Sequence, residues 1–151
     1  MAAVRDVASH FLALAAVDED GEGLTHLKLQ KLLYYAQGFH IAISGGRLFP
    51  ETIEAWDHGP VVPAAWQAYR EFGSAPIPTP EATDTALEEE QRDLLNDVWN
   101  TYGQFSAWKL RNMTHEEPPW RDAYRPGRNV TITDDALARY FRTQVADGEA
   151  A

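Results

Sequence analysis

The 151-residue sequence contains no cysteine. Disulfide bonds and cysteine-ligated zinc sites are therefore excluded, and the composition fits a reducing compartment. Long hydrophobic runs are missing too, because Arg5, Asp6 and His10 interrupt the apolar N-terminal segment. An acidic stretch at 18–22 follows where a signal peptide would need its cleavage site. We therefore expect a cytoplasmic protein that does not associate with membranes.

Basic residues are few. The chain has 13 Lys and Arg against 23 Asp and Glu, which gives a formal net charge of −10. Proteins that bind nucleic acid gain much of their affinity from a basic face that neutralises phosphates. The basic residues here are scattered, which argues against direct nucleic-acid binding. The acidity itself has two interpretations that the sequence leaves open: it keeps the protein soluble, or it matches a basic protein partner.

Motifs of catalytic chemistry are also missing. The sequence has no G-x-S-x-G elbow, no phosphate-binding loop and no G-x-G-x-x-G motif. None of its five histidines stands three or four residues from another, the helical spacing that lets two imidazoles share a metal ion. His115 and Glu116 begin like a zinc-protease motif, but the second histidine is absent. We predict a protein that is not an enzyme, without catalytic, cofactor-binding or metal-binding residues. The alternative is a hydrolase, metal-dependent or not, that uses His58 and His115.

Apolar residues make up 44% of the chain, and most of them recur at helical spacing. This pattern predicts about six helices, at 2–17, 25–44, 61–72, 85–102, 107–114 and 133–145, with a short helical turn at 118–124. Thr25, Ser106 and Thr133 are the expected N-caps of three of them, because a hydroxyl can accept a free backbone N–H of the first turn. Thr85 and Glu88 form a capping-box pattern for a fourth.

The helix after Thr25 is predicted to be the central core helix, because its apolar stripe is wide. The stripe consists of Leu29, Leu32, Leu33, Ala36, Phe39 and Ile43. Lys28, Lys31 and Tyr35 lie off this stripe and are expected on another face of the helix.

A few short strands are expected beside the helices. Residues 47–56 predict one or two strands or a small hairpin, and 130–132 predict a further strand. Gly59 and Pro60 are expected to turn the chain with His58 at the tip, and Pro63 suits the first turn of the next helix. The proline-rich connector at 73–83 is too short to separate two domains. The predicted fold class is mainly α, a single compact domain of about six helices with a small two- or three-stranded β element.

Three sequence blocks occur in order along most of the chain. They are a K-x-x-K-L-L-Y helix at 28–34, a Leu48-Phe49 turn followed by E-A-W and G-P-V at 54–61, and a T-H…P-W element at 114–120. They resemble the Panacea-domain antitoxins, the family of SocA-type antitoxins and GepA-like phage-associated proteins. The resemblance covers about 24–141 of a single domain at 1–151, with an N-terminal helix at 1–17 and an expected disordered tail at 147–151. His58 departs from the family pattern.

The resemblance implies the antitoxin half of a bacterial or phage toxin–antitoxin pair, with a role in phage defence. Such a protein neutralises a cognate toxin, encoded nearby, by binding it directly. A DNA-binding transcriptional regulator is the alternative, because some relatives carry an N-terminal DNA-binding module. Only one short helix precedes the resemblance here, so autoregulation through DNA contact is not expected. Self-association stays open.

Candidate contact residues come from the aromatic content, because Trp and Tyr are frequent anchors of protein interfaces and the chain has five Trp and six Tyr. We predict toxin contacts at Lys31, Tyr35, Trp56, His58, Tyr69 and Arg70, each against the alternative that the residue belongs to the scaffold. The residues of the family motif that are expected to be structural are Lys28, Leu32, Leu33, Tyr34, Phe49, Gly59, Pro60, Thr114, His115 and Trp120.

Overall fold

The computed structural model describes residues 1–18, 23–80 and 86–145, and within these ranges it contains seven α-helices, one 3₁₀ turn and three strands. In chain order they are α1 Val4–Ala16, α2 His26–Ser44, β1 Ile53–Trp56, β2 Gly59–Val61, α3 Pro63–Tyr69, the 3₁₀ turn Arg70–Phe72, α4 Glu89–Tyr102, α5 Ala107–His115, α6 Pro118–Ala123, β3 Val130–Ile132 and α7 Asp134–Val145. The mainly helical fold class is confirmed. The tail predicted at 147–151 lies outside the described residues.

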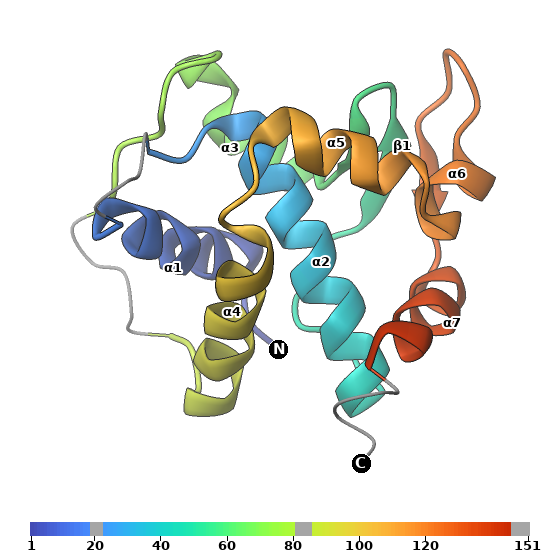
Figure 1. The fold of residues 1–151 in the computed structure, drawn as a ribbon, viewed down its shortest axis with the longest axis horizontal. Coiled ribbons are helices and arrows are strands. Elements are labelled where there is room, and N and C mark those ends of the chain that lie inside the picture. Colours follow the sequence, from blue (N-terminus) through green and yellow to red (C-terminus); the bar gives the residue numbers. More distant parts are fainter. Residues whose placement is uncertain (19–22, 81–85, 146–151) are drawn as a thin grey trace.

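Helix α2 runs through the middle of the molecule, with α1 and α4 on one side, α7 on the other and α5 crossing its N-terminal half (Figure 1). Every residue from Leu29 to Gly38 is buried, because neighbours cover all sides of this stretch. The central position is confirmed. Lys31 and Tyr35, which lie off the predicted stripe, are fully buried as well. Ile43, expected in the stripe, is 54% exposed because it lies in the last turn of α2, beyond the fully buried stretch.

The helix starts follow their capping residues. Thr25, Ser106 and Thr133 each accept a backbone N–H of the helix that follows, as predicted. The predicted start of α4 is wrong. Thr85 lies outside the described residues, and the capping box is formed one turn later by Glu88 and Gln91. The backbone N–H of Glu88 donates to Gln91 Oε1 at 2.8 Å.

The three strands form an antiparallel sheet in the order β2-β1-β3. Strands β1 and β2 make a hairpin in which Trp56 pairs with Gly59 and Ala55 pairs with Pro60. The chain therefore turns at Asp57 and His58, as expected for His58, whereas Gly59 and Pro60 belong to β2 rather than to the turn. Proline is tolerated there because β2 is an edge strand and needs no second row of N–H donors.

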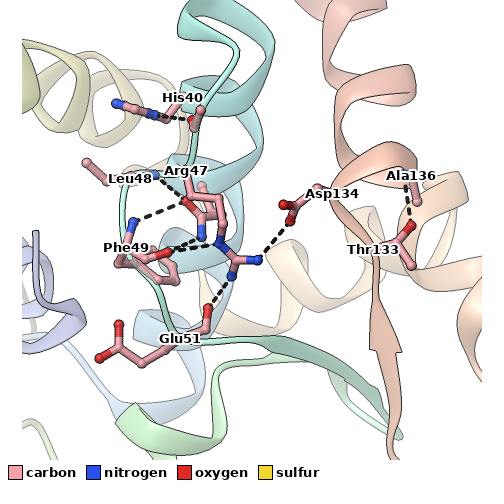
Figure 2. A network of polar contacts seen from close by, with 10 residues as sticks. His40, Arg47, Leu48, Phe49, Glu51, Thr133, Asp134 and Ala136 are labelled. Carbon is pink, nitrogen blue, oxygen red and sulfur yellow. Dashed lines mark hydrogen bonds and ion pairs between the residues drawn. The ribbon is translucent and has the colours of Figure 1, made fainter. Parts of the chain in front are cut away.

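The loop between α2 and β1 is fastened to the helices by two polar side chains. The buried Gln37 amide accepts the N–H of Leu48 at 2.7 Å and donates to the carbonyl of Phe49 at 2.8 Å. Figure 2 shows Arg47 reaching three acceptors, the carbonyls of Phe49 and Glu51 and the carboxylate of Asp134 at the start of α7. These contacts fix Leu48 and Phe49 in the core.

Helix α7 packs closely against α2 at a glycine. A Cβ atom at Gly38 would lie 2.1 Å from the ring of Phe141, so only glycine permits this approach of the two helices. The rings of Phe39 and Tyr34 meet the same phenylalanine edge-on, with centroids 4.8 and 5.4 Å away. No helix in the described ranges has the length and hydrophobicity needed to cross a membrane.

Candidate functional site

The hairpin of β1 and β2 is held by side chains from α5, from α6 and from Tyr124, the residue that follows α6. The Trp120 indole of α6 donates to the carbonyl of Trp56 at 2.7 Å. His115 of α5 lies between the carbonyls of Arg111 and Asp57, at 2.7 Å and 3.0 Å from its two ring nitrogens. The hydroxyl of Tyr124 donates to the Asp57 carboxylate, which raises the pKa of that tyrosine. The turn at 57–58 is thus fixed before any partner arrives.

Lys31 of α2 lies beneath this hairpin. Its Nζ donates to the carbonyl of Pro60 at 3.3 Å, and burial together with the charge of Arg111 lowers its pKa to about 7. Gly59 has φ +114°, and a Cβ there would lie 2.6 Å from Lys31 Cε and 2.9 Å from Thr114 Oγ1. Glycine is therefore required by both the backbone conformation and the space.

A cavity of about 360 Å³ opens between the hairpin, the start of α2, α3 and the loop at 127–129. Its lining includes Leu27, Trp56, Asp57, His58, Val61 and Trp66. The two tryptophan rings meet edge-on with centroids 5.5 Å apart, and Arg70 lies over the Trp66 ring at 5.2 Å. The lining is therefore aromatic, with charged groups near its rim.

Two polar side chains of α2 that line this cavity carry unpaired nitrogen atoms. Gln30 is buried, and its Oε1 accepts the N–H of Val62 at 2.8 Å. Its Nε2 has no hydrogen-bond partner among the described residues, and neither ring nitrogen of His26 has one. Burial, followed by the charge of Lys31, lowers the pKa of His26, so the ring is neutral at pH 7. Unpaired hydrogen-bonding groups therefore lie in the wall of an apolar cavity.

An exposed aromatic and basic patch adjoins the cavity. The Trp108 side chain on α5 is 59% exposed, and the guanidinium of Arg111 lies 4.5 Å from its ring centroid. Arg111 Nε in turn donates to Nδ1 of His58 at 3.4 Å. We call the contiguous set Trp56, His58, Trp66, Arg70, Trp108 and Arg111 the tryptophan–arginine face.

The carboxylate of Glu117, between α5 and α6 in the chain, is buried. Tyr34 and Tyr35 donate to the two oxygens of Glu117, each at 2.9 Å. Burial raises the pKa of Glu117 to about 7, although bonds from Tyr35, Tyr34 and Tyr140 act against that rise. Burial also raises the pKa of both donor tyrosines. The cluster joins the start of α6 to α2.

The predicted contact residues separate by burial. Trp56 is half-buried, and His58 and Arg70 are exposed, so these three lie on the tryptophan–arginine face. Lys31, Tyr35 and Tyr69 are buried, and a partner could touch them only if the domain opened. The physical reason is that helix α2 has no free face where Lys31 and Tyr35 lie.

The predicted structural residues are spread over the core. Leu32, Leu33, Tyr34, Phe49 and Trp120 are buried hydrophobic residues, and Gly59, Pro60 and Thr114 are buried at the hairpin. Lys28 donates to the carbonyl of Gly103 at 2.6 Å and lies 5.4 Å from the Trp99 ring. His115 has both ring nitrogens at backbone carbonyls, as described above.

Several functional candidates have no signal in the sequence pattern. Gln30 and His26 lie on the helix that carries the core, and Arg111 and Trp108 lie on a short helix with no wide apolar stripe. Only the HEEPPW block could have pointed to Glu117, as an acid beside two prolines. No group of three or more His, Asp or Glu side chains in the described ranges is arranged to hold a metal ion.

These features define a single-domain, mainly helical protein built around a clamped hairpin. Residues 29–121 match the model of the SocA-like antitoxin family, Panacea domain, and the chain belongs to this family. It is 28% identical over 138 residues to Antitoxin SocA of Caulobacter vibrioides (strain NA1000 / CB15N), which covers 80% of this chain and 73% of that protein. No solved structure matches the chain. The predicted resemblance is confirmed, and the matched segment includes the hairpin together with His115 and Trp120.

Proposed function

We propose that this protein is the antitoxin of a bacterial or phage toxin–antitoxin pair, and that it neutralises a toxin encoded nearby by binding it directly in the cytoplasm. The family assignment supports an antitoxin role. The observation that carries direct binding is the exposed contact between Trp108 and Arg111 beside the turn at His58. Trp and Arg are the residue types that most often dominate binding energy at protein interfaces.

Three physical properties favour the tryptophan–arginine face as the toxin contact. Its aromatic rings offer apolar area with few rotatable bonds. The hairpin is fixed by Trp120, His115 and Tyr124, so binding does not have to order it. Arg70 and Arg111 make this face locally positive in a chain of net charge −10, which gives the contact an electrostatic orientation.

Co-expression with the protein encoded beside it tests the proposal. We expect growth arrest from the neighbour alone, relief by this protein, and a complex that survives size-exclusion chromatography. Trp108→Ala and Arg111→Ala should each weaken the complex at least about tenfold, the scale of a binding hot spot. A neighbour that is harmless alone, or that stays toxic beside this protein, refutes the proposal.

Matched controls are available on the far side of α2. Ile43 is an exposed apolar residue at the other end of that helix, and Arg142 is an exposed arginine on α7. Ile43→Ala and Arg142→Ala should leave toxin affinity within about twofold, since scattered surface residues rarely carry binding energy. A double substitution of His58 and Arg70 that leaves affinity unchanged would place the interface elsewhere.

A further inference from the structure

The cavity beside the tryptophan–arginine face has an unusual combination of properties. It is walled by Trp56, Trp66, Leu27 and Val61. Its lining also includes Gln30 and His26, and Gln30 Nε2 and the His26 ring nitrogens have no hydrogen-bond partner among the described residues. A buried polar group with no hydrogen bond carries a cost in stability. The fold tolerates this cost at two adjacent residues on one wall of an open cavity, as expected if a ligand supplies the missing partners.

The free groups indicate the chemistry of the occupant. The Gln30 amide N–H₂ can only donate, so it requires an oxygen acceptor, whereas a neutral His26 ring can donate or accept. Between these groups and the two tryptophans there is room for one bulky apolar side chain and its backbone. An extended peptide provides both a side chain and a carbonyl acceptor.

The charged side chains at the rim indicate which kind of peptide segment fits the cavity. Arg128 lines the cavity, Arg70 lies over the Trp66 wall, and Arg111 contacts His58 on the opposite wall. Two carboxylates lie near the same rim and keep their charge, because their donors are neutral: Asp57 accepts from the Tyr124 hydroxyl and Glu54 accepts from the Trp56 indole at 2.9 Å. Three arginines against these two carboxylates leave the rim with one net positive charge, which favours an acidic segment.

We propose that this cavity is the recognition pocket for an acidic segment of the toxin, which packs one aromatic or large aliphatic side chain against Trp56 and Trp66. A backbone carbonyl of that segment accepts from Gln30 Nε2, and a neighbouring carboxylate lies against Arg128. This inference rests on the proposed direct binding of a toxin, and it adds the chemistry of the bound segment and its place on this chain.

Photo-crosslinking of the intact complex tests the occupant. Asn129 is exposed and lines the cavity, so p-benzoylphenylalanine placed there reports on whatever enters. We expect crosslinks to a single toxin segment in which an Asp or Glu adjoins an aromatic or large aliphatic residue. A normal complex with no crosslink from position 129, or with a crosslinked segment that lacks an acid, overturns the proposal.

Filling the cavity tests its contribution to affinity. Leu27→Trp replaces an aliphatic side chain in the first turn of α2 by an indole ring that fills the cavity. We expect it to bind the toxin at least tenfold more weakly. Leu94→Trp is the matched control, because Leu94 lines a separate hollow against Phe39 and Ile43. It should change affinity by less than twofold, with both variants checked for folding by thermal unfolding. If Leu27→Trp does not fold, the crosslinking result decides.

The outcomes separate the two proposals. If the neighbouring protein forms no complex with the unmodified chain, the proposed function fails. If the complex forms and Leu27→Trp binds as well as the unmodified chain, the function stands and the pocket proposal is overturned. A small molecule that native mass spectrometry finds on the unmodified protein from expressing cells, and that Leu27→Trp removes, would also overturn it.

Discussion

The ammonium group of Lys31 lies 3.3 Å from the carbonyl oxygen of Pro60, in the interior of the domain. This contact joins the central helix to the edge strand of the hairpin. It is made by a cation that the fold has removed from water, and its pKa falls to about 7 for that reason. The hairpin is therefore fastened at a thermodynamic cost that depends on pH.

Lys31 should make the protein more stable as pH rises. Because the pKa is lowered on folding, the unfolded chain binds more protons than the folded one between pH 7 and the ordinary lysine pKa of 10.5. The free energy of unfolding should then increase by up to about 1.4 kcal/mol per pH unit. Urea unfolding from pH 7 to about 8.5, below the range where unfolded tyrosines ionise, should show this slope in the unmodified protein and not in Lys31→Met. Lys109→Met, at an exposed lysine, should keep it.

Glu117 should have the opposite effect at lower pH. Its pKa rises from 4.5 to about 7 on folding, so the folded chain binds more protons in that interval and stability is lost as pH rises through it. Glu117→Gln should remove this loss, whereas Glu116→Gln, at the exposed neighbour, should not. His26, with its lowered pKa, acts in the opposite direction over part of the range, so the difference from the unmodified protein is the quantity to compare. Identical pH profiles would contradict the prediction.

Gln37 should be costly to replace although it is far from the tryptophan–arginine face. Gln37→Leu removes a donor and an acceptor from the buried backbone of Leu48 and Phe49, and we expect a loss of about 2–4 kcal/mol from two unpaired groups. Gln104→Leu, at an exposed glutamine, should change stability by less than about 0.5 kcal/mol. The measurement is chemical denaturation at one pH. A loss under 1 kcal/mol for Gln37→Leu would contradict the expected role.

Gly38→Ala should destabilise the protein although alanine favours a helix. Its methyl group would meet the Phe141 ring at 2.1 Å, and the ring is fully buried and cannot move freely. Overpacking of this kind costs about 1–3 kcal/mol. Gly46→Ala is the control, because no atom lies within 4 Å of a Cβ there. Equal thermal unfolding temperatures for the two variants would show that α7 can shift away from α2.

The hairpin was predicted in part. The alternating pattern of β1 and the tip at His58 could be read from the sequence, because strand periodicity and turn propensity are local properties. The placement of Gly59 and Pro60 in β2 could not, because it depends on pairing with Ala55 and Trp56 and on clearance above Lys31. The start of α4 was predicted one turn too early. Thr85 and Glu88 are both acceptable N-caps, and the helix begins after Glu88.

The contact residues were harder to predict than the elements. Lys31 and Tyr35 have the chemistry of surface residues, and only the helices packed around α2 bury them. Trp108 has the chemistry of a core residue and is exposed because α5 is short and turns that side to solvent. Gln30 gives no sign in the sequence that its amide lines a cavity.

By itself the sequence determined which segments are helical, where most helices begin, that α2 is the central helix, and the family. Periodicity, capping and motif order are carried by residues close together in the chain. Only the tertiary structure decided that Trp120, His115 and Lys31 fasten the hairpin, that Glu117 is buried among tyrosines, and that Trp56 and Trp66 wall a cavity. These relations join side chains far apart in sequence, and their burial and charge depend on packing that no local pattern encodes.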